Sequence, residues 1–583
     1  MIRNIFIWGM LCFFYSAWGQ QTFFPKTTFQ SSHLWRPNTD LKTKGILVYD
    51  TKKVDGKDFE YRVNTWRIHR YTPQLMISFS WGADSLHAFK WQTLQSGEYR
   101  MHCNLHYFIP DDAYCKYIFH SKIKRAIDAG IQDIVFEEPE FYINCNPEIK
   151  DSCKNEILFK ALQSIITISK EYARQVHKKI RCFIATHSIF NYANWGIISP
   201  EILLSNISGL DGFIGQVWQD TANNPIDTRF TTFEQAYIEY ASLSALTNSN
   251  NKYLLFLTDP VGDKRRTWKA YQEGYLATTI AMLMIANVNN YEVLPWPHRI
   301  FEYRYPLNNI TDKPTPIPDD FRSLILIFNQ IMAAMPYEKT KDECNVLISN
   351  LLMERDREGN KRPELIRKYY DKLLPLVKIG SNIHFIFIED TIALNKIKKE
   401  EIYAPVAFSA SNSSIGNNGY QSDFRNLNIK PKSIYQIRRG NYLLTYTIPN
   451  DSTNKTIPSL KGTYIDILDN RLKIITKKKI LPNTVSALYD ISSVDHTSPN
   501  ILVSASTDSI VKCTTSTFEY IAFGPAQSIN KQRIYLPRKP TQIIIKSHKG
   551  KEIPYNSSYN NKYHMLFLSF SNDHQGCRVT INS

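Results

Sequence analysis

Between about residues 45 and 300, short apolar runs typical of buried strands alternate with stretches that carry apolar residues at helical spacing. The runs occupy residues 45–50, 75–81, 99–105, 133–138, 180–187, 212–218, 253–259 and 291–296. Helical spacing occurs at 121–130, 155–176, 233–247 and 267–287. Strands alternating with helices in this number predict an α/β fold, a (β/α)8 TIM barrel. An open doubly wound sheet is the alternative, but no glycine-rich phosphate loop follows the first run.

The pattern changes after the predicted barrel. Residues 306–320 are polar and rich in proline, as in a linker, and residues 321–335 have helical spacing. A strand, a helix and a strand follow at 345–352, 363–380 and 382–390, which predicts a small α/β segment. From about residue 430 to 583, short apolar strands alternate with turn residues. This last pattern predicts a C-terminal antiparallel β-sandwich.

The N-terminus has the features of a secretory signal peptide. Arg3 precedes an apolar stretch at 5–18, and Ala17 and Gly19 place small residues before Gln20. A membrane anchor is the alternative, but the stretch is shorter than the ~20 residues that a span needs. We therefore expect a secreted or periplasmic protein, or one associated with the cell surface. The expected division is a signal peptide (1–19), a catalytic barrel (20–305), a linker helix with the small α/β segment (306–408) and the C-terminal sandwich (409–583).

Charge and cysteine content narrow the set of partners. The chain has 70 Lys and Arg against 54 Asp and Glu, a net charge of +16. An acidic or sulfated glycan suits such a charge, although a lysine-rich solvated surface explains it more simply. No arginine-rich arm, RNA-binding signature or phosphate loop indicates nucleic-acid or nucleotide binding, and we expect no cofactor. Cys145 and Cys153 share a polar loop and are a candidate disulfide in an oxidising compartment.

The polar residues of the predicted barrel gather where its strands end, which is where barrel enzymes carry their chemistry. The six runs from 99–105 onward all end in polar or aromatic groups, while their starts and middles are apolar. In chain order the candidates are Asn104, His106, Glu137, Glu138, Glu140, His187, Asn191, Trp195, Gln216, Trp218, Asp259, Trp296 and His298. Each alone has an ordinary structural explanation, but the shared placement predicts an active site.

Two carboxylates from well-separated strands suit glycoside hydrolysis, which needs a proton donor and a nucleophile or base. We predict Glu138 as the acid and Asp259 as its partner. Strand alternation puts Glu138 on the face of Ile134 and Phe136, and Glu137 on the other, so Glu138 is expected to point into the barrel mouth with Glu137 offset.

The remaining candidates are assigned to the substrate. The neighbouring glutamates are expected to raise the pKa of the acid by like-charge repulsion or to contact the sugar. The tryptophans offer flat apolar faces for a sugar ring, and the histidines and amides offer hydrogen bonds to hydroxyls.

Several segments resemble a known group of enzymes. VFEEPEFY (135–142), HSIFNYANWGIISPE (187–201), DGFIGQVWQDTA (211–222), FLTDPVGD (256–263), YEVLPWPHRIF (291–301) and, outside the barrel, KGTYIDILD (461–469) are similar to exported bacterial glycosidase-like proteins. The layout resembles the clan of (β/α)8 glycoside hydrolases that includes the family 42 β-galactosidases. That resemblance implies an acid on strand four, a nucleophile on strand seven, and a small α/β domain and a β domain after the barrel. It covers most of residues 45–305 and, more loosely, 430–583.

Two positions depart from that clan. Glu137 stands where the clan usually has Asn, and Asp259 stands where it usually has Glu. A shorter nucleophile changes the carboxylate separation, for which ~5–5.5 Å implies retention and ~6.5–9.5 Å inversion. The second carboxylate is then open among Asp259, Glu140, Asp220 and Asp263.

Three hypotheses follow. The first is an exported glycoside hydrolase acting on an oligosaccharide or glycan. The second is a non-catalytic glycan-binding protein on a degenerate barrel, which the missing Asn-Glu pair favours. The third is a metal-dependent hydrolase with ligands among His102, His106, His187 and Asp259, although the His-x-His expected on the first strand of such enzymes is absent and we expect no metal.

Overall fold

A computed structural model gives the structure of the chain. It describes residues 26–50, 57–79, 81–83, 96–99, 101–102, 105–140, 151–195, 201–218, 229–259, 267–334, 343–350, 363–406, 409–410, 413–414, 419–427, 429, 431–448, 459–479 and 481–583. The predicted signal peptide and Cys145 lie outside these residues, so the signal peptide and the 145–153 disulfide stay predictions. Within the described part, no helix has the length and apolar character needed to cross a bilayer.

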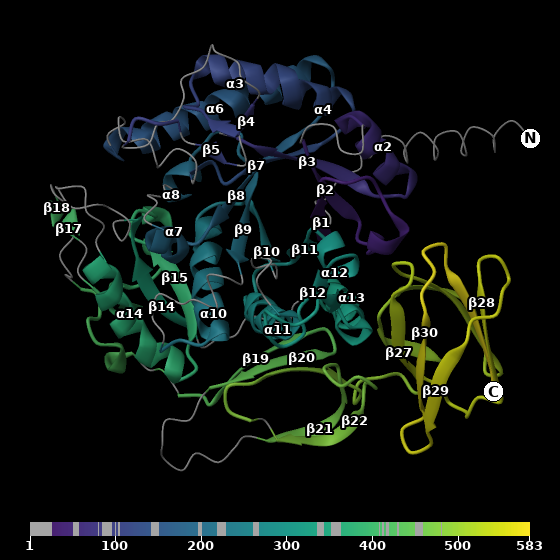
Figure 1. Cartoon of the computed structure of the whole chain (residues 1–583). Coiled ribbons are helices and arrows are strands. Elements are labelled where there is room, and N and C mark those ends of the chain that lie inside the picture. Colours follow the sequence, from purple (N-terminus) through teal and green to yellow (C-terminus); the bar gives the residue numbers. More distant parts are fainter. Residues whose placement is uncertain are drawn as a thin grey trace, which may run out of the picture.

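Eight parallel strands close into a barrel, which confirms the predicted fold (Figure 1). Around the ring they are β1 (Thr27–Ser31), β2 (Gly45–Tyr49), β3 (Thr72–Ser78), β7 (Asp133–Glu137), β8 (Arg181–His187), β9 (Gly212–Trp218), β10 (Tyr253–Asp259) and β11 (Asn290–Pro295). The ring closes because β11 pairs with β1.

Two of the predicted strands need correction. The barrel begins at β1, whose sequence TTFQS has no apolar run, because its inward residues Thr28 and Gln30 make side-chain hydrogen bonds inside the barrel. The run at 99–105 is not a barrel strand. Within it, Met101–His102 form β5 and Leu105 begins β6 (Leu105–Tyr107), and these two strands form a small antiparallel sheet with β4 (Trp81–Ala83). The two errors cancel, so β7 is still the fourth strand and β10 the seventh.

Helices surround the barrel on its outside (Figure 1). They are α2 (Phe59–Ile68), α3 (Asp112–Ile118), α4 (Lys124–Asp128), α6 (Asp151–Gln175), α7 (Ile189–Trp195), α8 (Glu201–Leu204), α10 (Thr232–Ser244), α11 (Trp268–Leu283), α12 (His298–Phe301) and α13 (Asp319–Ala333). Sequence signals fix several starts: Thr231 and Glu234 form a reciprocal capping box at α10.

Strand alternation builds two cores. Ile134 and Phe136 of β7 pack outward in the large cluster shared with the helices. Val135 faces the other way, into an interior cluster with Met76 and Phe183. The barrel is therefore a packed core whose mouth lies where the strands end.

The predicted α/β segment is confirmed as a three-stranded parallel sheet with one long helix. Its elements are β14 (Glu343–Ile348), α14 (Pro363–Lys378), β15 (Asn382–Phe387) and β16 (Ile402–Tyr403). Part of the preceding linker, β13 (Thr315–Pro316), pairs with β12 (Arg304–Tyr305) just before it.

The C-terminal region contains two β units. The first is a sheet of β19 (Ile434–Arg439), β20 (Tyr442–Thr447), β21 (Ser459–Asp466), β22 (Ile474–Lys479) and β23 (Val485–Asp490), which lies below the barrel in Figure 1. The second is the predicted sandwich, with its own apolar core. One sandwich sheet holds β24 (Asn500–Ser504), β27 (Ile529–Tyr535), β30 (Met565–Ser571) and β29 (Tyr555–Asn560); the other holds β25 (Thr507–Cys513), β26 (Thr517–Phe523), β31 (Cys577–Asn582) and β28 (Gln542–Ser547).

A buried arginine joins the first of these units to the barrel. Arg439 of β19 is fully buried, and its guanidinium donates hydrogen bonds of 2.9 Å to the carbonyl oxygens of Leu283 and Ile285 at the end of α11. A cation at these carbonyls satisfies acceptors that the helix leaves unpaired. The sheet is thus attached to the outside of the barrel, away from the strand-end residues.

Candidate active site

The end of β7 carries two glutamates that face different surroundings. Val135 lies in the barrel interior, so Glu137, two residues on, continues the inward face. This reverses the predicted assignment, in which Glu138 had the inward face. Glu138 leaves the strand instead, with a φ of 40°, a left-handed conformation that is unfavourable for a residue with a Cβ. The turn nevertheless brings its carboxylate to residues at the ends of β8 and β9.

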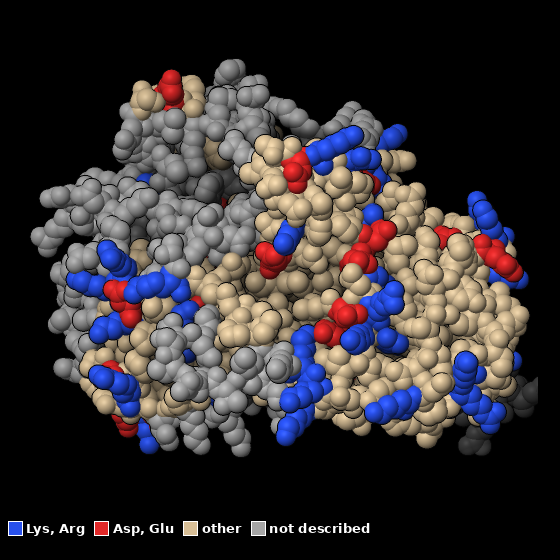
Figure 2. Space-filling view, turned by 60° about the horizontal axis from the view of Figure 1, so that its bottom comes forward, with Lys and Arg blue, Asp and Glu red and all other residues tan. Residues whose placement is uncertain are grey.

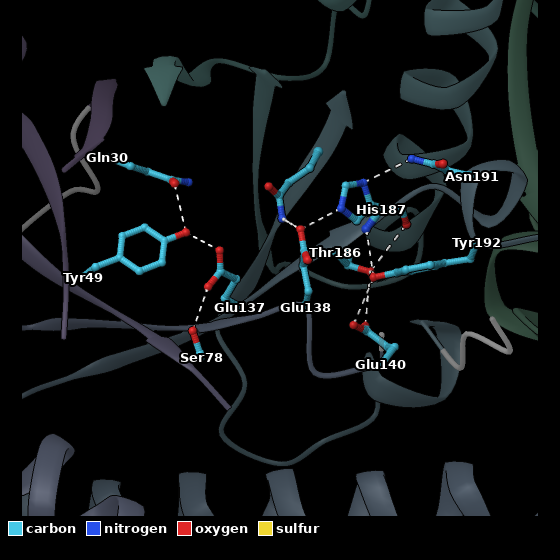
Figure 3. A network of polar contacts seen from close by, with 11 residues as sticks. Gln30, Tyr49, Ser78, Glu137, Glu138, Glu140, Thr186, His187, Asn191 and Tyr192 are labelled. Carbon is cyan, nitrogen blue, oxygen red and sulfur yellow. Dashed lines mark hydrogen bonds and ion pairs between the residues drawn. The ribbon is translucent and has the colours of Figure 1, made fainter. Parts of the chain in front are cut away.

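The carboxylate of Glu138 is held at one oxygen only (Figure 3). Nε2 of His187 lies 2.7 Å from Oε1 of Glu138, and Nε2 of Gln216 donates to the same oxygen over 3.3 Å. Among the described residues, no side chain bonds the second oxygen, Oε2. Glu138 as a whole is 5% exposed. This arrangement fixes the side chain while leaving one oxygen available for a proton or a substrate atom.

Glu137 is bonded at both oxygens. Its Oε1 accepts from the hydroxyl of Tyr49, and its Oε2 accepts from Oγ of Ser78 at 3.1 Å. Burial, together with the negative charge of Glu138, raises the pKa of Glu137 to about 8, although both hydrogen bonds act in the opposite direction. The Glu137 carboxyl therefore carries a proton at neutral pH.

An aromatic pair lies beside Glu137. The ring of Tyr49 stacks on that of Trp296, which directly follows β11, with centroids 4.7 Å apart and planes at 29°. Tyr49 also bonds Gln30 of β1 through its hydroxyl, at 3.1 Å. Trp296 is partly exposed and has a φ of 56°, and the guanidinium of Arg299 lies 5.5 Å from its ring centre. Tyr49 is buried, so within the pair it is the partly exposed ring of Trp296 that offers an apolar face of the kind that a sugar ring stacks on.

Glu140, the third glutamate of this stretch, is bonded to residues of β8 and α7. It is fully buried, and Oγ1 of Thr186 and the hydroxyl of Tyr192 each donate to its carboxylate over 3.2 Å. Burial raises the pKa of Glu140 to about 7. The substrate contact predicted for Glu140 stays a prediction, and in this structure its carboxylate is bonded to Thr186 and Tyr192.

The other predicted residues divide into three groups. His187, Asn191 and Gln216 are 0%, 2% and 3% exposed; His187 and Gln216 contact Glu138, and Asn191 contacts His187. Trp218 is partly exposed, and its ring lies edge-on to His187 at 5.0 Å. His298 is buried next to His33, with ring centres 4.6 Å apart, and burial lowers the pKa of His298 to about 3, so its imidazole is neutral.

The remaining candidates stay predictions. Asn104 lies outside the described residues, as do the side chains of His106, Trp195 and Asp259. The backbone of Asp259 is described: it ends β10, in register with Trp218 of β9. His106 belongs to β6 of the small antiparallel sheet, and Trp195 ends α7. In the part of the chain that the structure describes, no group of three metal-binding side chains is placed to hold an ion.

Three residues of this site were not predicted. Tyr49 and Ser78 end β2 and β3, and Glu292 is a fully buried carboxylate within β11. Glu292 lies close enough to Tyr49 to raise the pKa of that phenol. The sequence held a signal for two of them: Tyr49 ends an apolar run, and Glu292 is the only charged residue in the run YEVLPW.

No protein-family model matches the sequence, and no curated protein matches it. Distant likeness to solved structures is found. The catalytic module of a family 98 glycoside hydrolase from Streptococcus pneumoniae TIGR4 is 9% identical, with a TM-score of 0.38 over 96% of this chain and 98% of that one. The glycoside hydrolase domain of PelA from Pseudomonas aeruginosa is 9% identical, with a TM-score of 0.32 over 47% and 95%. A GH31 dextranase from Flavobacterium johnsoniae is 9% identical, with a TM-score of 0.31 over 96% and 71%.

These three proteins are glycoside hydrolases, and none is described as a family 42 β-galactosidase. The narrower resemblance to that clan therefore stays a prediction. At these identities and TM-scores, no residue role or activity is transferred from them to this chain.

Proposed function

We propose that the protein is a glycoside hydrolase that acts on an oligosaccharide or glycan, with Glu138 as its acid/base residue. The observation that carries the proposal is the one-sided anchoring of Glu138 at the barrel mouth. His187 and Gln216 hold Oε1, and Oε2 is left for the reaction. A general acid needs one oxygen held by the protein and the other unbonded, because the oxygen that gives up the proton must reach the glycosidic oxygen.

The reaction follows from these contacts. The proton on Oε2 of Glu138 passes to the glycosidic oxygen as the bond from that oxygen to the anomeric carbon breaks. A second carboxylate attacks that carbon or activates a water, and we assign this role to Asp259 at the end of β10. Stacking on the partly exposed ring of Trp296 would hold the sugar at the barrel mouth. Glu137, whose pKa is raised to about 8, is uncharged at neutral pH and adds no negative charge beside Glu138.

The test is a screen of the purified protein against chromogenic glycosides, plant and host glycans and sulfated glycans. On a substrate that is cleaved, Glu138→Gln and Asp259→Asn should each lower kcat by at least about 100-fold, because each removes a proton carrier or nucleophile. Glu140→Gln is the matched control, since it changes a glutamate of the same turn that is bonded away from the mouth. Wild-type turnover in Glu138→Gln contradicts the assignment, as does an equal loss in all three variants with the fold retained.

A glycan-binding protein without catalysis is the alternative outcome of the same screen. Calorimetry would then show binding of a glycan by the wild type, with no reducing ends released over long incubation.

Export is proposed from the N-terminal pattern, and detection of the mature protein outside the cytoplasm, beginning at Gln20, is its test. On the face shown in Figure 2, the described Lys and Arg side chains form several separate groups, some beside acidic residues, so this face does not indicate an acidic substrate.

A further inference from the structure

His187 has defined partners at both nitrogens of its ring. Nε2 lies 2.7 Å from Oε1 of Glu138, and Nδ1 lies 3.3 Å from Nδ2 of Asn191 (Figure 3). The ring is fully buried, and the rings of Tyr192 and Trp218 stand edge-on to it at 5.6 Å and 5.0 Å. The imidazole is thus fixed in place, and its function depends on which nitrogen carries hydrogen.

The contacts decide where that hydrogen lies. A carboxylate oxygen only accepts, so the short contact to Glu138 needs a hydrogen on Nε2. The amide nitrogen of Asn191 only donates, so the other contact needs a lone pair on Nδ1. Both conditions are met by one species, the neutral imidazole protonated at Nε2.

Asn191 is held by the fold and not by a substrate. It is 2% exposed and lies in α7, one helical turn after His187. Its backbone N–H donates to Oγ of Ser188 over 3.1 Å, and that hydroxyl donates to the carboxylate of Glu239 in α10, also over 3.1 Å. The amide is therefore placed before any ligand arrives.

We propose that Asn191 is a positioning residue that fixes His187 as the Nε2–H tautomer and thereby sets a permanent hydrogen-bond donor on Oε1 of Glu138. With Oε1 occupied by a donor, a proton taken up by Glu138 resides on Oε2, the oxygen that faces the reaction. The catalytic consequence rests on the proposed function, whereas the tautomer is a property of the resting protein. This assigns to Asn191 and His187 a supporting role in place of the predicted contact with sugar hydroxyls.

Other titratable groups surround this pair. Glu138 and Glu137 lie on the β7 side, and Tyr192 of α7 contacts both His187 and Glu140. Glu239 of α10 is linked through Ser188. A pH effect at His187 must be distinguished from the titration of these groups. A spectroscopic signal from the His187 imidazole itself makes that distinction.

The first experiment is NMR of the full-length protein labelled with ¹⁵N-histidine, in which two-bond ¹H–¹⁵N correlations distinguish the two neutral tautomers and the doubly protonated ring. His187→Gln identifies the signal of His187. The wild type should show the Nε2–H tautomer at neutral pH. An Nδ1–H tautomer or a doubly protonated ring overturns the proposal, and so does an exchanging mixture. This readout does not depend on activity, so it stands even if no glycoside is cleaved.

The second experiment replaces the amide. Asn191→Asp presents only an acceptor to Nδ1, so His187 should become doubly protonated, and the limb of the pH–rate profile that reports the acid should move to lower pH by about one unit. Asn191→Leu should leave KM within about twofold and lower kcat by about tenfold or more. Asn206→Asp, on an exposed loop, is the control for an added charge. An unchanged profile in Asn191→Asp, with an unchanged His187 signal, contradicts the role.

Discussion

Arg181 at the start of β8 forms two hydrogen bonds with the carboxylate of Asp133 at the start of β7, through Nε at 2.6 Å and through a terminal nitrogen at 3.0 Å. The Asp133 side chain is 2% exposed. Gln74 of β3 donates to the same carboxylate over 3.0 Å and accepts from Thr28 of β1 over 3.1 Å. A polar row therefore crosses the amino-terminal end of the barrel, on the opposite side from the proposed site.

Breaking that pair should be costly. Arg181→Met leaves Asp133 buried without its charged partner, and we expect the free energy of unfolding to fall by about 3–5 kcal/mol. Asp133→Asn combined with Arg181→Met should recover part of the loss, because no buried charge remains. Urea unfolding measures both variants. Arg425, whose side chain is 78% exposed in its pair with Asp423, is the control, and Arg425→Ala should change stability by less than about 1 kcal/mol.

The positive φ at residue 138 predicts that glycine is more stable than alanine there, the reverse of their order in a helix. Glu138→Gly should be more stable than Glu138→Ala by about 1 kcal/mol, since glycine adopts positive φ without the Cβ penalty. At Glu60, in the first turn of helix α2, the same pair of substitutions should rank in the opposite order by a similar amount. Thermal unfolding of the four variants decides this. Equal stability of Glu138→Gly and Glu138→Ala would show that the turn relaxes when the glutamate is removed.

Glu137 should make the stability of the protein depend on pH. Its pKa is raised from 4.5 to about 8, so the folded state holds a proton that the unfolded state has lost between these values. Stability from this group is therefore complete below about pH 4.5 and declines as pH rises toward 8, with a slope of at most about 1.4 kcal/mol per pH unit. Glu137→Gln removes that slope.

Urea unfolding at pH 5, 6, 7 and 8 provides the measurement. The stability of Glu137→Gln relative to wild type should rise steadily across this range. Glu140→Gln should also gain, but its gain should level off near pH 7, the value to which the pKa of Glu140 is raised. A difference between wild type and Glu137→Gln that is constant with pH would mean that Glu137 is ionised in the folded protein.

The stacked pair of Tyr49 and Trp296 predicts a binding effect that depends on the ring. If the proposed function holds, Trp296→Ala should raise KM by about fivefold, which corresponds to about 1 kcal/mol of aromatic contact. Trp296→Phe should retain most of the affinity. Tyr49→Phe keeps the stack but loses the bonds to Glu137 and Gln30, so it should lower stability by about 1–2 kcal/mol with a smaller effect on KM. A KM that responds to Tyr49→Phe and not to Trp296→Ala would contradict this division.

Periodicity predicted seven of the eight barrel strands, and the reason for the missing one is physical. The inward residues of β1, Thr28 and Gln30, bond polar side chains inside the barrel, so burial there does not require an apolar run. Conversely, the run at 99–105 resembles a buried strand, but Met101–His102 and Leu105 belong to β5 and β6 of a three-stranded sheet outside the ring.

The site shows a similar division. The rule that chemistry lies at strand ends brought Glu138, His187 and Gln216 together correctly, although they are far apart in the sequence. Alternation correctly separated Glu137 from Glu138, but the inward face was assigned wrongly, because Val135 and not Ile134 or Phe136 lines the interior. Glu138 reaches the mouth through its positive φ, which alternation does not predict. Tyr49 follows from the same rule applied to the run at 45–50.

The pairing of β1 with both β2 and β11 has a consequence for how the chain folds. Thr27 is in register with Tyr291, so the ring stays open until residues more than two hundred and fifty positions downstream have been made. Until then, both outer strands present unpaired backbone groups to any neighbouring chain. Such late, long-range closure slows folding and lengthens the time for which unpaired strand edges can aggregate. We therefore expect the growing chain to need chaperones.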